Sequence, residues 1–323
     1  MMKSSRGLLL LALATPFLAP LAAPADADAP LSKVPQSGWY RIALGVFEVT
    51  ALSDGTAPIP MEKRLTGSTP AKITAALTKA FLTSPFDTSV NTFLVNTGTK
   101  LVLIDAGTDG AFGPSVGKLL ANLKAAGYAP EQIDEIYITH MHGDHIGGLL
   151  TAGKPTFPHA TVRAAKAEAD FWLTQANMDK APAERKDLFK NAMATMNPLI
   201  AAGKLKPFDG PTDLVPGIKA VPAPGHTPGH TFYQVTSGGQ TLVAWGDALV
   251  VASVQLGDPT VGLTVDNDVK GAVAARKAAL ADAAKNGYIV ALAHVPFPGL
   301  GHVGAEGSGY RWYPVNYTFS PRK

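Results

Sequence analysis

Three of the eight histidines of this chain lie within seven residues, Thr139-His140-Met141-His142-Gly143-Asp144-His145, and this clustering limits the architectures that the chain can adopt. The segment follows a short apolar run, Glu135–Thr139, and precedes Ile146-Gly147-Gly148. This order predicts a loop at the C-terminal end of a strand, where α/β proteins place reactive groups. We therefore expect a sheet whose edge presents this loop.

The spacing within the segment fits metal binding. His140 and His142 are two residues apart in a near-extended stretch, so both rings can face one metal ion. Asp144 and His145 lie beyond a glycine-assisted turn and can face a second ion a few ångströms away. The helical His-Glu-x-x-His pattern of other metal sites is absent. A polar surface loop is the alternative, but four such side chains within six positions argue against it.

Three further residues complete the candidate set, and each lies just beyond an expected strand. His226 lies in the loop Pro-Gly-His-Thr-Pro-Gly-His (224–230), whose glycines and prolines restrict the backbone. Asp247 follows an expected strand over 241–245, and His294 follows one over 288–293. All can converge on one edge of a sheet sandwich, where a carboxylate such as Asp247 can bridge two divalent ions.

The hydrophobic pattern predicts an α/β fold. Two β-rich halves of similar size indicate two mixed β-sheets packed together and flanked by helices. We expect a strand pair over 38–54 that closes at Ser53-Asp54-Gly55, then an excursion over 56–85 with a helix near 71–81. The other expected strands are 91–96, 101–105, 135–139, 160–163, 205–208, 218–221, 231–235, 241–245 and 288–293, and the other expected helices are 114–126, 166–177, 183–202 and 269–286.

The first residues differ from the rest of the chain. A positive start with Lys3 and Arg6 precedes an apolar run over 7–23, and small residues then offer cleavage sites after Ala25, Ala27 or Ala29. This pattern predicts a signal peptide over 1–29, a periplasmic or secreted location, and a single mature domain over 30–323. A membrane anchor is the alternative, but two prolines break the run and it is short for a span.

Composition excludes several classes of protein. The chain has no cysteine, so disulfides, zinc fingers and iron–sulfur clusters are excluded, and every metal ligand must be His, Asp or Glu. The formal charge is +3 and no block of Lys and Arg stands out, so nucleic acid is not an expected partner. Beyond the leader, no apolar stretch is long enough to predict a membrane span.

Three motifs carry a family resemblance: Asp-Glu-Ile-Tyr-Ile-Thr-His-Met-His (134–142), Pro-Gly-His-Thr-Pro-Gly-His (224–230) and Gly-Tyr-Arg-x-x-Pro-Val-Asn-Tyr (309–317). With them, the chain from about Gly38 to Asn316 resembles the metallo-β-lactamase superfamily, and within it methyl parathion hydrolase and its arylesterase and lactonase relatives. The resemblance implies an αββα sandwich and two divalent ions, zinc foremost, with manganese, cobalt or iron as alternatives. It also implies that His140, His142 and His226 bind one ion and that Asp144, His145 and His294 bind the other. Asp247 is the implied bridge between the two ions.

The expected chemistry is hydrolysis at the two ions. Cations that share a water lower its pKa from ~15.7 toward about 7, and so supply hydroxide near neutral pH. Asp247 and Asp144 are the candidate catalytic residues, the first as the bridge and the second as a ligand that could also move a proton. Phenolate leaving groups need little acid assistance, which favours aryl esters and dihydrocoumarin-like lactones. Methyl parathion-like phosphotriesters are a further substrate class.

Other functions stay open on sequence alone. A lactonase of acyl-homoserine lactones is the main alternative. A β-lactamase is disfavoured because such enzymes often use a cysteine ligand, and a di-iron redox protein because those commonly carry Glu where His142 lies. A binding protein without catalysis is disfavoured because all seven ligands are present. The expected substrate is small and uncharged, and a homodimer is expected only because relatives are often dimers.

Supporting roles are expected around the ligands. By the family pattern, Asp105 orients a metal-bound histidine. His230, four residues after His226, is expected to make hydrogen bonds near the ions rather than to bind one. His159 and His302 have no partners in the sequence, and we expect them to be structural or surface residues.

The expected substrate pocket is apolar and consists of Phe112, Trp172, Leu188, Leu249, Val250, Leu263 and Val265. Leu188 falls where the resembling hydrolases tend to have an aromatic side chain, and the segment 181–189 is one residue shorter than in them. These departures argue against phosphotriester cleavage more than against the metal chemistry.

Overall fold

The computed structural model describes residues 29 and 31–319. Apart from Ala29, the expected signal peptide and its cleavage sites lie outside the described residues. Residues 1–36 and 37–323 cluster as two separate units, and the described part of the first unit contains no helix or strand. The second unit holds every described helix and strand, and among these no helix combines the length and the apolar character that crossing a membrane requires.

Six strands form the first sheet in the order β1-β2-β4-β5-β6-β9. The first four pair antiparallel, whereas β6 and β9 join β5 in parallel. The C-terminal ends of β5 and β6 therefore meet at one edge of the sheet. The strands are β1 (Trp39–Leu44), β2 (Phe47–Ile59), β4 (Phe86–Asn96), β5 (Leu101–Ile104), β6 (Glu135–Tyr137) and β9 (Thr161–Arg163).

Seven strands form the second sheet in the order β10-β11-β12-β13-β15-β16-β17, with β13 and β15 parallel and all other neighbours antiparallel. Its strands are β10 (Thr212–Val215), β11 (Ile218–Pro222), β12 (Thr231–Ser237), β13 (Gln240–Ala244), β15 (Ile289–Ala291), β16 (Leu300–Glu306) and β17 (Gly309–Pro314). Two small sheets pair β3 (Leu65–Thr66) with β14 (Gly262–Leu263), and β7 (Leu150–Thr151) with β8 (Lys154–Pro155).

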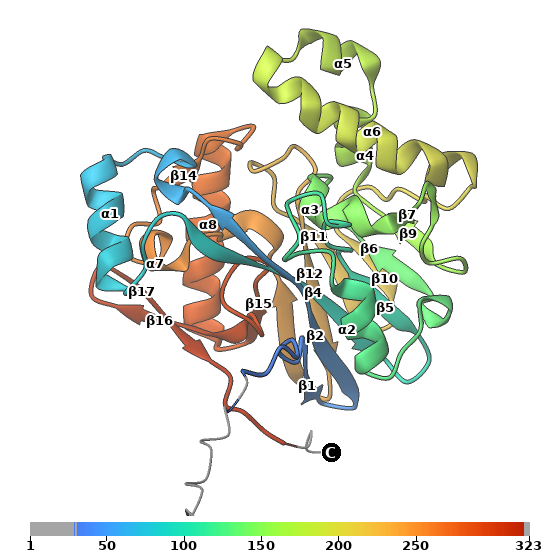
Figure 1. The fold of residues 1–323 in the computed structure, drawn as a ribbon, viewed down its shortest axis with the longest axis horizontal. Helices are drawn as coiled ribbons and strands as arrows, with labels where there is room; N and C mark the ends of the chain where they lie inside the picture. The colour runs from blue at the N-terminus through green and yellow to red at the C-terminus, as the bar shows by residue number, and fades with distance from the viewer. Residues whose placement is uncertain (1–28, 30, 320–323) are drawn as a thin grey trace, which may run out of the picture. The chain divides into compact units, whose positions relative to one another are not determined.

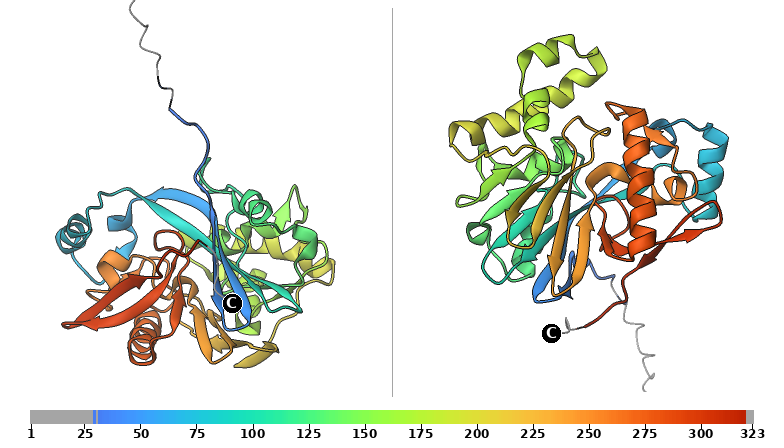
Figure 2. Two further views of the ribbon diagram at one scale, coloured as in Figure 1. Left: turned by 90° about the horizontal axis from the view of Figure 1, so that it is seen from below. Right: turned by 180° about the vertical axis from the view of Figure 1, so that it is seen from behind.

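Helices cover the outer sides of both sheets (Figure 1). Helix α8 lies along the outer side of the second sheet, as the view from behind shows (Figure 2), while α2 and α6 lie over the first. The helices are α1 (Pro70–Lys79), α2 (Leu119–Ala125), α3 (Gly143–Ile146), α4 (Lys166–Trp172), α5 (Gln175–Lys180), α6 (Lys186–Ala201), α7 (Ala252–Gln255) and α8 (Val269–Asn286).

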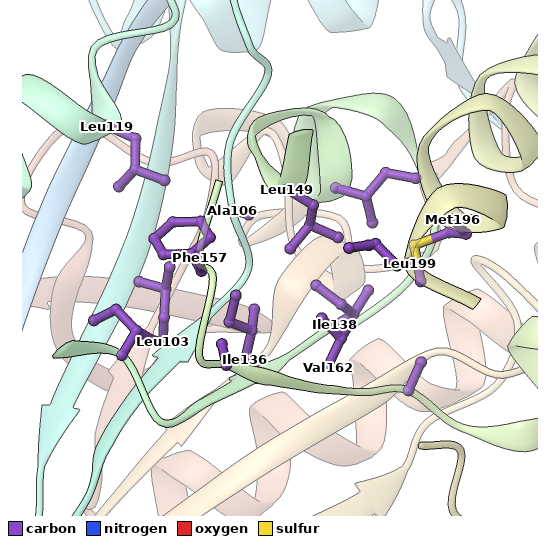
Figure 3. Close-up of a cluster of buried hydrophobic side chains, with 14 of the residues drawn as sticks. Leu103, Ala106, Leu119, Ile136, Ile138, Leu149, Phe157, Val162, Met196 and Leu199 are labelled. Carbon is purple, nitrogen blue, oxygen red and sulfur yellow. The ribbon is translucent and has the colours of Figure 1, made fainter. Parts of the chain in front are cut away.

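Successive side chains of a strand point to opposite faces of the sheet, and this alternation produces the layers. Leu103 of β5 belongs to the outer cluster, which also contains the helical residues Leu119 and Leu199 (Figure 3), whereas its neighbours Val102 and Ile104 belong to the cluster between the sheets. A third cluster joins α8 to the outer side of the second sheet. Each fully buried Leu or Ile contributes roughly 1.5–3 kcal/mol of transfer free energy. The predicted αββα arrangement of two mixed sheets is confirmed.

The expected turn at Ser53-Asp54-Gly55 is wrong. Strand β2 continues to Ile59, and the turn lies earlier, at Gly45 and Val46. Gly55 adopts a positive φ of 117° within a bulge of β2, and a side chain there would also meet the carbonyl oxygen of Ser115 at 1.9 Å. The glycine thus permits close approach of a loop rather than a chain reversal.

Several expected boundaries also need correction. The helix expected over 114–126 is only α2, because Gly117 has a positive φ and the preceding residues form turns. The helix expected over 166–177 is interrupted after Trp172, which separates α4 from α5. The strand expected over 205–208 is reduced to isolated bridges of Leu205 and Phe208. Strand β10 and the hairpin β16–β17 were not expected, and the excursion 56–85 packs with residues 250–263 as a satellite core.

Candidate metal centre

The seven candidate ligands lie just beyond strand ends that meet at one place in the fold, with Asp144 and His145 in the short helix α3. The loop carrying His140 and His142 follows β6 of the first sheet and runs into α3. His226, Asp247 and His294 come after β11, β13 and β15 of the second sheet. The site therefore joins the two sheets, which is why its members are far apart in the sequence.

Group 1 consists of His140, His142 and His226. Nδ1 of His142 lies 3.1 Å from Nε2 of His140 and 3.1 Å from Nε2 of His226. The ligands of a tetrahedral ion with metal–nitrogen distances of ~2.0–2.1 Å lie about 3.3 Å apart. The three nitrogens thus have the separations that one zinc-sized ion requires, and the residues are between 0% and 6% exposed.

Group 2 consists of Asp144, His145 and His294. Nε2 of His145 lies 3.3 Å from Nε2 of His294, and Oδ2 of Asp144 lies 3.4 Å from the latter. The side chain of Asp144 is 24% exposed, unlike those of its two partners. Group 2 is therefore the part of the centre that solvent reaches.

Asp247 lies between the two groups and presents one oxygen to each. Its Oδ2 is 3.3 Å from Nε2 of His226, and its Oδ1 is 3.0 Å from Nε2 of His294. The backbone of Gly246 makes this placement possible, since a side chain there would meet Oγ1 of Thr139 and Nε2 of His230 at 2.8 Å. A single carboxylate can thus bridge two ions.

Hydrogen bonds to the outer ring nitrogens determine which nitrogens face inward. Nδ1–H of His145 donates to Asp105 (2.8 Å), that of His226 to Asp266 (2.7 Å) and that of His294 to the carbonyl of Ser89 (2.8 Å). These oxygens only accept, so in the neutral ring each Nε2 has a lone pair that faces inward. Inward-facing lone pairs at about 3 Å repel one another unless a cation lies between them, so the donor set fits bound metal ions.

The electrostatic environments of the two groups differ. Burial, reinforced by neighbouring imidazoles, holds the pKa of His140 and of His142 well below 6.5. Burial also acts to lower the pKa of His145 and His294, but Asp247 and nearby carboxylates outweigh it, so the pKa of His145 is well above 6.5 and that of His294 is raised to about 8. His140 and His142 therefore offer neutral imidazoles, and group 2 lies in a negative field that favours a cation.

Asp105 and His230 lie beside the ligands, as expected. Asp105 accepts hydrogen bonds from the backbone N–H and the hydroxyl of Thr139 as well as from His145. Nε2 of His230 accepts a hydrogen bond of 3.1 Å from the backbone N–H of Asp247. Burial lowers the pKa of His230 to about 3, so its ring is neutral and able to accept.

The residues of the expected substrate pocket are placed unevenly. Phe112 is 47% exposed and its ring lies beside Gly143, and Leu188 and Val265 are half-buried. Leu249, Leu263 and Val250 are buried in the cores beside the site. Trp172 is fully buried and packs edge-on against His142, with ring centroids 5.4 Å apart, so in this conformation it lies behind a ligand rather than on an open surface.

The two remaining histidines lie away from the centre. His159 is exposed, and Nδ1 of His302 donates to the backbone carbonyl of Gly287 at 3.0 Å. A cavity of about 1050 Å³ between α8 and strands β11–β13 includes His302 but none of the seven candidate ligands. Neither histidine belongs to the metal centre.

Two buried acids at the site were missed by sequence reasoning. Asp266 accepts the ring hydrogen bond of His226, and Glu168 accepts hydrogen bonds from the loops around His142 and His226. No local signal distinguishes them, because Glu168 reads as an ordinary helical residue and Asp266 lies in a polar turn close to Asp268.

Comparison with known proteins agrees with this geometry. The family model described as the metallo-beta-lactamase superfamily matches residues 85–294, a span that contains all seven candidate ligands and well over half of the chain. The chain therefore belongs to the metallo-β-lactamase superfamily. It is a metallo-hydrolase of that fold, with His/Asp clusters suited to two metal ions.

More specific similarities come from solved structures and one curated relative. The structure of the hydrolase AbOPH of the beta lactamase superfamily matches with a TM-score of 0.84 and 35% identity, over 88% of this chain and 100% of that one. AidC, described as a dizinc quorum-quenching lactonase, matches with a TM-score of 0.79 and 29% identity, over 87% of this chain and 99% of that one. The uncharacterized protein YobT of Bacillus subtilis (strain 168) is 30% identical over 164 residues, 49% of this chain and 61% of YobT. The chain thus spans less than two thirds of that relative's length.

Proposed function

We propose that this protein is a dinuclear metal-dependent hydrolase of small, uncharged carboxylic esters, namely lactones and aryl esters. The observation that carries the proposal is the placement of Asp247, whose two oxygens face two separate groups of metal-binding side chains at 3.0–3.3 Å. An arrangement of this kind holds two cations close enough to act on one scissile bond. Zinc is the first choice for both positions, with manganese, cobalt and iron as alternatives.

Similarity to AidC supports the ester class. That protein is described as a dizinc lactonase in complex with a lactone-hydrolysis product, and its similarity extends over 87% of this chain. Acyl-homoserine lactones are accordingly the second candidate substrates. Phosphotriesters are a third substrate class, which the test below includes.

The chain's own residues would divide the work as follows. When bound, two divalent ions would lower the pKa of a water toward about 7 and polarise the scissile carbonyl. Asp247 would hold both ions, because one of its oxygens faces each group. Oδ2 of Asp144 faces the histidines of group 2, and its other oxygen, Oδ1, could take the proton that the attacking water releases and return it to the leaving oxygen. Phe112, whose ring lies beside Gly143, offers an apolar surface for an uncharged substrate.

Three wider expectations accompany this proposal. We propose that residues 30–323 act as one domain, that the protein is exported after removal of its leader, and that it forms a homodimer. Expression with the full leader, followed by N-terminal sequencing and measurement of the mass in solution, tests the last two, and a single cooperative unfolding transition tests the first.

A substrate panel tests the proposed reaction. The zinc-loaded protein should hydrolyse dihydrocoumarin, phenyl acetate or N-hexanoyl homoserine lactone, and methyl parathion should be a poorer substrate. Asp247→Asn should abolish turnover, whereas Glu135→Gln, which removes an ion pair with Arg163 away from the centre, should leave it unchanged. Two bound metals with no turnover of any lactone or aryl ester would refute the substrate class. Absence of bound metal would refute the dinuclear mechanism.

A further inference from the structure

His142 is the one ligand histidine whose outer ring nitrogen has no hydrogen-bond partner among the described residues. Nε2 of His142 is buried and unpaired. The other four rings are held by direct hydrogen bonds, including that of His140, whose Nδ1 lies 3.1 Å from the hydroxyl oxygen of Thr139. Since ligand orientation depends on such partners, something else must hold His142 in place.

Trp172 lies directly behind the ring of His142. The two rings meet edge to face, with centroids 5.4 Å apart and an interplanar angle of 67°. Trp172 is itself fully buried, packed against Phe171 and Phe189, and its Nε1–H donates to Oε1 of Glu168 at 2.7 Å. The indole ring that packs against His142 is therefore held by a hydrogen bond to the carboxylate of Glu168.

Glu168 also holds the backbone on both sides of group 1. Its Oε1 accepts a hydrogen bond of 2.8 Å from the backbone N–H of Met141, the residue between His140 and His142. Its Oε2 accepts from the hydroxyl of Thr227 at 2.8 Å and from the backbone N–H of Gly229 at 2.9 Å. Four donors from three segments thus converge on a side chain with no exposed surface.

The approach of these segments is tight. A side chain at Gly229 would meet the backbone nitrogen of Glu168 at 2.2 Å, so the loop that carries His226 lies directly against the start of α4. Movement of Glu168 would therefore shift the loops of His142 and His226 together. Among the described residues, the loop that carries His294 donates no hydrogen bond to this carboxylate, and Asp144 and His145 lie in α3, which begins after the loop of His142.

We propose that Glu168 is the positioning residue of the group 1 metal site, and that Trp172 transmits its constraint to His142. This inference rests on the proposed function only in that the centre must bind metal. Glu168 touches no reacting atom. It determines the orientation of His142 and the spacing between the loops of His142 and His226.

The chemistry of the site requires a carboxylate. All four partners donate, so a glutamine would turn an NH₂ group toward two of them. If the NH₂ group faced Met141 and Trp172, it would meet two N–H donors that cannot accept a hydrogen bond. If the NH₂ group faced Thr227 and Gly229, the hydrogen bond from the backbone N–H of Gly229 would still be lost. Glu168→Gln therefore preserves volume and disturbs the loops.

The test is metal affinity, measured without substrate. Stepwise zinc dissociation constants come from competition with a chromophoric chelator, and the steps are assigned with His226→Asn for group 1 and His294→Asn for group 2. In Glu168→Gln, zinc affinity of the group 1 step should fall about 10–100-fold, the usual cost of losing a partner behind a ligand. The group 2 step should change less than about threefold, and the cobalt absorption of the group 1 site should shift.

A matched control separates positioning from general damage. Asp54 is another buried carboxylate that accepts four hydrogen bonds, from Thr108, Gly117 and Leu119, but it contacts neither group 1 loop. Asp54→Asn should lower the melting temperature without changing the group 1 step. Trp172→Phe removes only one donor and keeps an aromatic ring behind His142, so it should weaken that step by only a few-fold, and Trp172→Ala should weaken it more.

The outcomes distinguish this inference from the proposed function. If the wild type binds two ions and Glu168→Gln binds both with unchanged affinity, Glu168 does not position group 1. Equal weakening of both steps, or the same loss in Asp54→Asn, also overturns the inference. Should Glu168→Gln not fold, Trp172→Phe and Trp172→Ala carry the test, and equal zinc affinity in both variants would reject it. A wild type that binds no metal refutes the proposed function instead.

Discussion

Groups 1 and 2 share Asp247 but are held in different ways. Group 1 consists of imidazoles with almost no exposed surface, supported by Asp266 and by the convergent bonds of Glu168. Group 2 includes the side chain of Asp144, which is 24% exposed, and its two histidines donate hydrogen bonds to Asp105 and to the carbonyl of Ser89. The difference suits group 1 to rigid binding of an ion, whereas group 2 is the side open to solvent.

The largest effect should come from removing what the groups share. Asp247→Ala deletes the oxygens that face both groups, leaving several inward-facing nitrogens without a counter-charge. We expect esterase or lactonase activity to fall by more than about 100-fold, beyond the range for partners behind a ligand, and the metal content to drop. Elemental analysis and steady-state kinetics check this. Retention of two tightly bound ions would show that Asp247 is not the bridge.

The next largest effect should come from removing the carboxylates that accept hydrogen bonds from the outer ring nitrogens, and it should distinguish the two groups. Asp266→Asn disturbs the partner of His226, and Asp105→Asn disturbs the partner of His145. Each should weaken metal binding by about 10–100-fold, the first in group 1 and the second in group 2. Chelator competition measures both steps. An equal effect of both variants on both steps would remove the distinction drawn above.

A smaller difference should appear in the order of metal loss. Asp144 is partly open to solvent, so a chelator can reach the group 2 ion first. In a time course with excess chelator, we expect one ion per chain to leave about tenfold faster, and His294→Asn to abolish this fast phase. A ligand that binds only the folded state at 100 times its dissociation constant stabilises it by about 2.7 kcal/mol, so the melting temperature should fall in two steps. Simultaneous loss of both ions would contradict this order.

The smallest effect concerns the pH dependence of the metal-free protein. His140 and His142 have lowered pKa values when folded, so their contribution to stability is present above about pH 6.5 and is lost as the unfolded chain takes up protons below it. His294, with its pKa raised to about 8, contributes stability that is complete below about pH 6.5 and is lost as pH rises through about 8. We expect the melting temperature to fall on both sides, with His294→Asn reducing the alkaline fall and His142→Asn the acid one. A profile that is flat on either side would contradict the corresponding assignment.

Much of the fold followed from local pattern, and the exceptions have physical causes. Strands such as β5, β12 and β13 were predicted because alternating or continuous apolar runs between turns depend on short-range burial. Gly55 was misread because a glycine that closes a turn and one that lets another segment approach look alike in sequence. The break after Trp172 was missed because α4 ends where its packing against Phe189 and His142 places it, not at a helix-stopping residue.

In the metal centre, too, some residues could be predicted from local sequence and others depend on tertiary packing. The candidate ligands were identifiable because His and Asp followed expected strand ends, and strand ends in a packed sandwich meet at an edge. Glu168 was not identifiable, since a glutamate four residues before a tryptophan on a helix is ordinary. Its four partners come from residues 141, 172, 227 and 229, and only the packing of the two sheets brings them together.

By itself, the sequence determined which side chains could bind metal and that each would lie beyond a strand, because residue type and hydrophobic period are local properties. The tertiary structure alone decided that Asp247 divides its oxygens between two groups, that His142 faces inward through Nδ1, and that Trp172 lies behind it. Those facts depend on distances between segments far apart in the sequence, as between His142 and His226, which are 84 residues apart. Such distances are set by how the sheets and helices pack, and no local pattern encodes them.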